Sequence, residues 1–240
     1  MISIVAVEGI QELEEGDDLA AFVAERAELE DGDVVVVAQK AVSKIEGRVV
    51  RLDDVVPSER ARELAGGTDP RRLEVILQES VRLVRTRPPL VISETRHGFV
   101  CASAGVDQSN APEAGMLVLL PVDPDASAAR LRDGLRERTG RFVGVIVADS
   151  FGRAWRQGTT DVAVGAAGVR VLLDLHGERD RVGYELHATV IALADEIAGA
   201  AQLVMGKLDG VPVAVVRGLD VAGEESARDL VMPADRDLFR

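Results

Sequence analysis

Residues 34–38, four consecutive valines followed by an alanine, constrain the fold of this chain more than any other segment. β-Branched side chains favour extended backbone. An apolar run without polar alternation is typical of a strand that is buried on both faces. The segment therefore predicts a buried strand.

The remaining sequence mixes further short apolar runs with amphipathic stretches. Consecutive strands occur beside strand–helix alternation, so the sequence favours an α+β (mixed α/β) fold with mixed sheets and flanking helices. No repeat or long linker divides the chain, and we expect a single unit over residues 1–240, either undivided or built from two interleaved subdomains. Further strands are predicted over residues 2–7, 90–93, 98–103, 116–122, 143–147, 161–166, 169–173 and 212–216. Helices are predicted over residues 18–29, from Ser58, over 69–83, 127–139 and 185–205, with a helical tail after the last strand.

Composition excludes several classes of partner. The formal net charge of −13 argues against nucleic acid or an anionic membrane, because basic surfaces provide most of the affinity for both. No apolar run reaches the roughly 18 residues needed to cross a bilayer. Residues 1–5 lack the basic start of a signal peptide, and Cys101 is the only cysteine, so no internal disulfide is expected. We expect a cytoplasmic protein.

The common phosphate-binding and hydrolytic motifs are missing from the sequence. There is no GxxxxGK[ST] loop, no GxGxxG after a strand and no GxSxG elbow. The three histidines do not have the spacing of a metal cluster. A triphosphate site in this chain therefore has to be built without a P-loop.

Two acidic segments follow predicted strands. Asp149 and Ser150 come directly after the strand over 143–147, where strand ends deliver side chains into a crevice, and a carboxylate beside a hydroxyl suits Mg²⁺ or Mn²⁺. Arg153 follows closely and is able to hold a phosphate. An ordinary Asp-Ser turn accounts for the same spacing equally well. Asp107 and Asn110 lie in a loop of small residues that resembles an Asx-rich turn, or converges on one ligand.

Lysines are scarce in this chain, and their positions indicate a binding site. Only three of the 28 lysine and arginine residues are lysines, namely Lys40, Lys44 and Lys207. Each falls just beyond a predicted regular element and close to an apolar strand. This distribution favours a polyanionic ligand such as a nucleoside triphosphate.

Six motifs occur in a fixed order along residues 7–224, nearly the whole chain. They are VEG, GDVVVVAQKAVSKIEGR, RTRPPLVISETRHGFVCASAGVDQSN, ADSFGRAWRQGTTDVAVG, ADEIAGAAQLVMGK and VPVAVVRGLDVAGE. Together they closely resemble the coenzyme F420-0:γ-glutamyl ligase family. Any one of them alone is weak evidence, but their common order is specific.

The resemblance implies an activity and a set of site residues. Members of this family join L-glutamate to coenzyme F420-0 with GTP and then add γ-linked glutamates, through an acyl phosphate. The implied cofactors are Mg²⁺ or Mn²⁺ at up to two sites, with K⁺ as a further candidate, and the implied assembly is an intertwined homodimer. Asp107, Asp149 and Ser150 resemble the metal ligands, and Asp149, Lys44 and Arg153 are the expected catalytic residues. The expected nucleotide contacts are Ile10, Gln11, Glu12, Leu13, Gln39, Lys44, Asn110, Met205, Gly206, Lys207, Leu208, Asp209, Gly210, Val211 and Pro212.

The chain departs from the family pattern at two places. Lys207 stands where some members have a side-chain oxygen for the second metal, with Asp209 nearby as a replacement, and Gln39 and Lys40 stand where some members have small hydroxyl residues. Some relatives carry an additional flavin-binding reductase domain, which this sequence is not expected to contain. Two alternatives stay open: another nucleotide-dependent carboxylate–amine ligase, or a non-catalytic nucleotide-binding module of the same fold.

Overall fold

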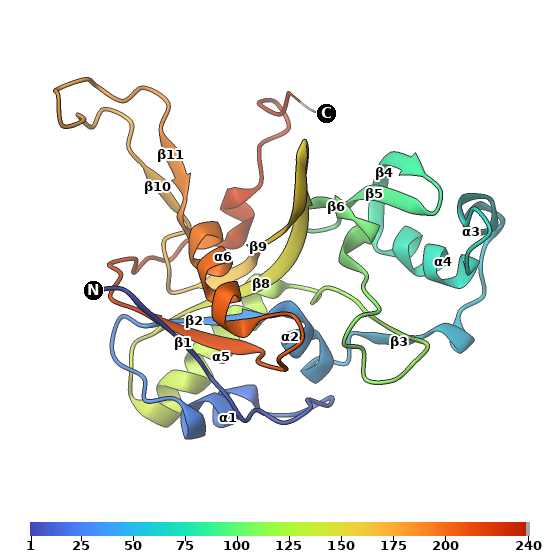
Figure 1. Ribbon diagram of the computed structural model, residues 1–240, viewed down its shortest axis with the longest axis horizontal. Helices are drawn as coiled ribbons and strands as arrows, with labels where there is room; N and C mark the ends of the chain where they lie inside the picture. The colour runs from blue at the N-terminus through green and yellow to red at the C-terminus, as the bar shows by residue number, and fades with distance from the viewer. Residues whose placement is uncertain (239–240) are drawn as a thin grey trace.

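A mixed five-stranded sheet forms the centre of the protein in a computed structural model, which describes residues 1–238 (Figure 1). β2 and β8 run parallel, and every other neighbouring pair is antiparallel. The predicted mixed α+β class is confirmed. The strands in spatial order are β1 (Ser3–Ala6), β12 (Val213–Arg217), β2 (Val34–Ala38), β8 (Gly144–Arg153) and β9 (Arg156–Ala167).

Helices cover both faces of this sheet, which explains the valine run. Val35 and Val37 pack into the core beneath α1 (Leu19–Arg26) and α5 (Pro124–Thr139). Val34 and Val36 face the opposite way and pack against α6 (Leu193–Met205). All four valines are at most 1% exposed, so the prediction of a strand buried on both faces is confirmed.

Residues 49–119, here called the outer lobe, form a second group of elements beside the main sheet (Figure 1). Their own apolar core includes Leu73, Ile76 and Leu117. β4, β5 and β6 pair antiparallel, and so do β3 and β7. The elements are β3 (Val49–Arg51), η1 (Leu52–Asp54), α3 (Glu59–Leu64), α4 (Pro70–Gln78), β4 (Ser80–Arg87), β5 (Leu90–Thr95), β6 (Val100–Ala102), η2 (Ser103–Gly105) and β7 (Met116–Val118).

Residues 172–192, here called the arm, project away from the rest of the molecule (Figure 1). β10 (Leu172–Asp174) and β11 (Val190–Ala192) pair at its base. The remaining elements are α2 (Gln39–Ile45), directly after β2, and η3 (Ala227–Leu230) in the C-terminal segment. No helix within residues 1–238 has the length and apolar character of a membrane span.

Several predicted boundaries were wrong, and pairing with distant strands explains most of them. The helix predicted over 69–83 ends at Gln78, because residues from Ser80 pair with β5 as strand β4. The helix predicted from residue 185 begins at Leu193, since β11 pairs with β10. The strand predicted over 143–147 continues to Arg153 alongside β9. The helical tail is reduced to η3, and residues 239–240 of the predicted unit lie outside the described residues.

Candidate functional site

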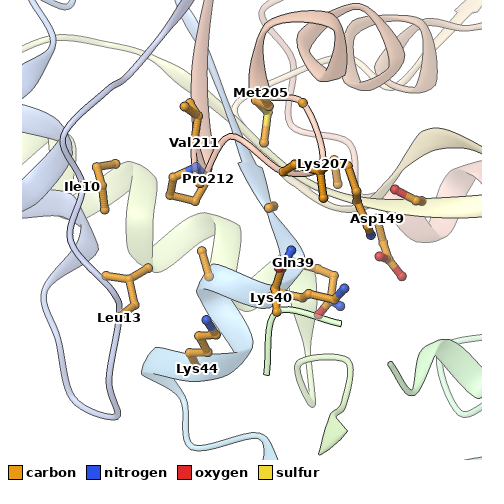
Figure 2. A pocket seen from close by; sticks show the side chains of 18 of the residues that line it. Ile10, Leu13, Gln39, Lys40, Lys44, Asp149, Met205, Lys207, Val211 and Pro212 are labelled. Carbon is orange, nitrogen blue, oxygen red and sulfur yellow. The ribbon is translucent and has the colours of Figure 1, made fainter. Parts of the chain in front are cut away.

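A cavity of about 530 Å³ lies beyond the carboxyl end of β2, the central strand of the main sheet (Figure 2). Its size is in the range typical of small-molecule sites. Ala38, the last residue of β2, pairs with Ala148, so Asp149 and Ser150 are the first residues of β8 beyond the end of the parallel partner. Strand β8 continues to Arg153, but its parallel partner β2 ends at Ala38, and the side chains of Asp149 and Ser150 therefore reach the cavity.

Most of the residues expected to bind a nucleotide line this cavity, although they come from distant parts of the chain. The N-terminal loop, α2, the outer lobe and the turn between α6 and β12 each contribute to the wall (Figure 2). The expected residues on the wall are Ile10, Gln11, Glu12, Leu13, Gln39, Lys44, Asn110, Asp149, Ser150, Met205, Gly206, Lys207, Leu208, Gly210, Val211 and Pro212.

Three of the expected residues do not line the cavity. Arg153 is exposed near the tip of the β8–β9 hairpin. Asp209 folds back over Gly206 within its own turn. Asp107 lies just behind the wall, where it contacts Lys40. The geometry thus separates Arg153 and Asp209 from the other expected residues.

All three lysines of the chain reach the cavity. Lys44 is buried in α2 and forms an ion pair with Glu12 of the N-terminal loop. Lys40, one turn earlier in α2, pairs with Asp107. Lys207 approaches from the turn after α6 (Figure 2). A wall with three ammonium groups is suited to phosphate oxygens.

Asp149 carries the most perturbed carboxyl group of the cavity. Burial raises the pKa of Asp149 to about 7, against a backbone hydrogen bond from Ser150 and the charge of Lys40. Desolvation disfavours the ionised carboxylate, so a cation bound here would relieve an existing electrostatic penalty. This is a different situation from an ordinary exposed Asp-Ser turn.

Asp161 also belongs to the cavity and was missed in the sequence. It lies on β9 directly opposite Ser150, whose Oγ donates to Asp161 Oδ1 at 2.6 Å. Burial raises the pKa of Asp161, while Ser150 and the charges of Lys207 and Lys40 lower it. Only the β8–β9 register brings Asp161 to this place, and no local sequence signal reveals that register.

Asp107 is fixed by four hydrogen bonds. Its Oδ1 accepts from the backbone N–H groups of Gln108 and Ser109, at 2.7 and 3.0 Å. Its Oδ2 accepts from Ser109 Oγ at 2.7 Å and from Lys40 Nζ. Burial alone would raise the pKa of Asp107, but the hydrogen bonds from Lys40 and Ser109 outweigh it and hold that pKa well below its usual range.

The donor set around the cavity suits a hard divalent cation. Asp107, Asp149 and Ser150 offer carboxylate and hydroxyl oxygens, the ligands that Mg²⁺ and Mn²⁺ prefer. Within residues 1–238, no three His, Cys, Asp or Glu side chains are arranged to hold a metal by themselves. Mg²⁺ commonly binds through one or two carboxylates and completes its shell with water and substrate phosphates. The residues present therefore fit a metal that arrives together with a nucleotide.

Gln39 offers a further ligand group on the cavity wall. Its Oε1 accepts from Ser43 Oγ at 2.9 Å, whereas the buried Nε2 has no hydrogen-bond partner in the described part of the chain. A buried donor without an acceptor is unfavourable, so a ligand acceptor at this point would be stabilising.

Comparisons with known proteins identify the family of the chain. Residues 9–218 match the family model described as F420-0:Gamma-glutamyl ligase. The chain is 50% identical to the coenzyme F420:L-glutamate ligase of Methanopyrus kandleri over 233 residues, covering 94% of this chain and 92% of the relative. It is 44% identical to the protein of that name from Methanocaldococcus jannaschii over 216 residues, covering 88% and 86%. For the protein of that name from Methanothermobacter thermautotrophicus the identity is 42% over 250 residues, covering 100% and 99%. The chain belongs to the F420-0:gamma-glutamyl ligase family.

Proposed function

We propose that this protein joins L-glutamate to coenzyme F420-0 through an amide bond, using GTP, and then adds γ-linked glutamates. The observation that carries the proposal is one cavity lined by three lysines together with Asp149 and Ser150. The names of the relatives specify a ligase that acts on coenzyme F420 and L-glutamate. The lysines suit a triphosphate, and the oxygen atoms of Asp149 and Ser150 suit the metal ion that accompanies a triphosphate.

The reaction has to convert a carboxylate into a better acyl donor, because oxide is a very poor leaving group. In the proposed route a carboxylate oxygen of the acceptor attacks the γ-phosphorus of GTP, and the bond to the β-phosphate oxygen breaks. The resulting acyl phosphate is attacked at carbon by the glutamate amine, which loses a proton as phosphate leaves. The products are an amide, GDP and phosphate.

The residues of the cavity have distinct roles in this route. Lys44 and Lys207 bind and orient phosphate oxygens, and Gln39 Nε2 donates to an acceptor on the nucleotide. Asp107, Asp149 and Ser150 would hold Mg²⁺ or Mn²⁺, which neutralises charge on the transferred phosphoryl group when it is bound. Arg153 lies outside the cavity, so its expected catalytic role has no geometric support here.

Four further expectations stay predictions. The homodimer, a second metal site and the K⁺ requirement come from the family resemblance, and the cytoplasmic location comes from the composition of the sequence.

A product-mass assay tests the proposed function directly. The protein is incubated with F420-0, L-glutamate, Mn²⁺ and either GTP or ATP, and product masses are read by mass spectrometry. We expect mass increments of added glutamate only with GTP. Ligation of glutamate to a different acceptor would favour another carboxylate–amine ligase, whereas GTP binding without glutamate-dependent phosphate release would favour a non-catalytic module.

Substituting Asp149→Asn tests the metal end of the cavity. We expect turnover to fall by about a hundredfold or more, because the amide cannot replace a negatively charged ligand. Asp54→Asn on the exposed surface of the outer lobe is the matched control and should keep wild-type turnover. Near-normal turnover of Asp149→Asn at saturating Mn²⁺ would contradict the assignment.

A further inference from the structure

Lys40 and Asp107 form a contact between the two parts of the protein. Lys40 lies in the first turn of α2, beside the main sheet, whereas Asp107 belongs to the outer lobe. The Lys40 Nζ donates to Asp107 Oδ2 and also, at 2.7 Å, to Ser109 Oγ. The Lys40 side chain is only 12% exposed, so this ammonium is held in place by the contact rather than by water.

Four hydrogen-bond donors occupy the carboxylate of Asp107 while this contact persists. An ionised carboxylate offers about four lone-pair sites. Two backbone N–H groups occupy Oδ1, and Ser109 Oγ and Lys40 Nζ occupy Oδ2. A metal ion therefore binds to Asp107 only if one of these donors leaves. Lys40 is the donor whose charge opposes the metal, so it is the donor expected to leave.

The Lys40 ammonium already lies where the carboxylates of the cavity would attract a cation. The charges of Asp149 and Asp161 act on it together with that of Asp107. It lines the same cavity as Lys44 and Lys207, so a modest rotation of its flexible stem turns its ammonium from Asp107 toward the space where phosphates would lie. Contacts with phosphate oxygens would therefore replace the contact that the Lys40 ammonium loses when it leaves Asp107.

We propose that the Lys40 ammonium occupies the metal position at Asp107 until nucleotide phosphates draw it away, and that Lys40 thereby makes tight metal binding dependent on nucleotide binding. The inference rests on the metal and nucleotide site of the proposed function. It adds a positioning role for a residue that the family resemblance left as a departure from the common pattern. Because such coupling is reciprocal, metal must strengthen nucleotide binding by the same factor.

Mn²⁺ titrations of the whole protein, followed by the electron paramagnetic resonance of free Mn²⁺, test this inference. Each titration is done without nucleotide and with a non-hydrolysable GTP analogue, after correction for Mn²⁺ bound by free analogue. The neutral variants are Lys40→Met and Lys40→Gln, and Lys40→Arg keeps the charge. Lys44→Met is the matched control, because it removes one positive charge from the same cavity without touching Asp107. Thermal unfolding of each variant establishes that it is folded.

The wild-type protein should bind Mn²⁺ weakly alone and at least about tenfold more tightly with the analogue. Both neutral variants should bind Mn²⁺ alone about tenfold more tightly than the wild-type, and the analogue should add much less. Lys40→Arg should stay close to the wild-type, and Lys44→Met should tighten Mn²⁺ binding far less than Lys40→Met does.

Two results would overturn the coupling. One is the same Mn²⁺ affinity without nucleotide in the wild-type and both neutral variants, and the other is an equal gain from Lys44→Met, which would indicate only a general effect of charge. Failure of the proposed function would look different. Absence of glutamate-containing products in the mass assay would reject the ligase while leaving the titration result valid, whereas absence of any Mn²⁺ binding with the analogue would reject both.

Discussion

Ser150 and Asp161 face each other across the β8–β9 pair, and their hydrogen bond fixes the direction of the serine hydroxyl. Ser150 Oγ donates to Asp161, so its lone pairs are left to accept or to coordinate. An outer residue that orients a metal ligand in this way commonly affects metal binding and turnover by about 10–100-fold. Asp161 is thus expected to act through Ser150 rather than on the substrate itself.

This coupling predicts a non-additive pair of substitutions. Ser150→Ala and Asp161→Ala should each lower kcat by about 10–100-fold, and the double variant should lose little more than the worse single one. Steady-state kinetics of the four proteins gives the interaction directly. Losses that multiply would show that the two side chains act independently.

His97 predicts a pH dependence of stability that is separate from the cavity. Its ring is buried, and Nε2 donates to the carbonyl oxygens of Pro121 and Val122, at 2.9 and 3.2 Å. Burial lowers the pKa of His97 below its ordinary value, against those backbone hydrogen bonds, while the charges of Glu79 and Arg96 act in opposite directions. The unfolded chain therefore takes up this proton first, and the free energy of unfolding should fall as the pH drops below about 6.5.

Replacing His97 removes that contribution. His97→Gln keeps a donor at the end of the side chain but cannot titrate. Urea unfolding at pH 7.5 and 5.5 should show a smaller loss of stability on acidification for the variant than for the wild-type protein. Equal losses would mean that His97 does not titrate differently in the folded and unfolded states.

Helix α5 packs directly onto the backbone of β9. A Cβ added at Gly165 would lie 2.3 Å from the carbonyl oxygen of Pro124, the first residue of α5. Neither backbone yields easily, so Gly165→Ala should push the helix from the sheet and lower the free energy of unfolding by about 1–3 kcal/mol. Gly152→Ala, where the same Cβ meets nothing within 4 Å, is the control. Urea unfolding compares the two, and equal stabilities would show that α5 adjusts without strain.

Local signals predicted those elements that depend on neighbouring residues. Ser58 accepts from the backbone N–H of Ala61 as the cap of α3, and Gly140 ends α5 with a positive φ of 69°. Both effects act within a few residues, so they can be recognised in the sequence. Part of β4 was predicted to be helical. Its extended conformation depends on pairing with β5, and neighbouring residues do not reveal that pairing.

The candidate site likewise combines residues that local patterns indicate with residues whose position depends on distant pairing. Asp149 and Ser150 could be singled out because an acid and a hydroxyl follow an apolar run, although the expected strand end proved to be the end of β2 rather than of β8. Asp161 lacked such a signal, since its place depends on antiparallel register. Physical patterns thus indicated Asp149, Ser150 and the three lysines, whereas resemblance to a family was needed to predict that the N-terminal loop belongs to the same site.

The cavity depends on the relative position of the main sheet and the outer lobe. Asn110 reaches the wall from the outer lobe, and Lys40 holds Asp107 of that lobe from α2. The site is therefore assembled by tertiary packing rather than by one loop. A ligand that rearranges the Lys40 contact acts on the junction between the two parts as well as on the metal position.

The arm is a candidate contact surface for the predicted homodimer. An isolated two-stranded ribbon is marginally stable in water, yet this one projects from the molecule with Val182 81% and Tyr184 62% exposed. The alanines of α6 at 194, 198 and 201 are fully buried within the same chain, so this face of the helix is not available for a dimer contact. The arm is a candidate contact, because covering it with a second copy would remove Val182 and Tyr184 from water.

Light scattering coupled to size exclusion tests the arm as a dimer contact. The wild-type protein should have about twice the chain mass of 25.6 kDa. Val182→Asp combined with Tyr184→Asp should yield the monomer, because burying two carboxylates in an apolar contact is strongly unfavourable. Val56→Asp changes a similarly exposed valine of the outer lobe and should leave the mass unchanged. A monomeric wild-type protein would contradict the homodimer itself, whereas a double variant that stays dimeric would place the contact on another surface.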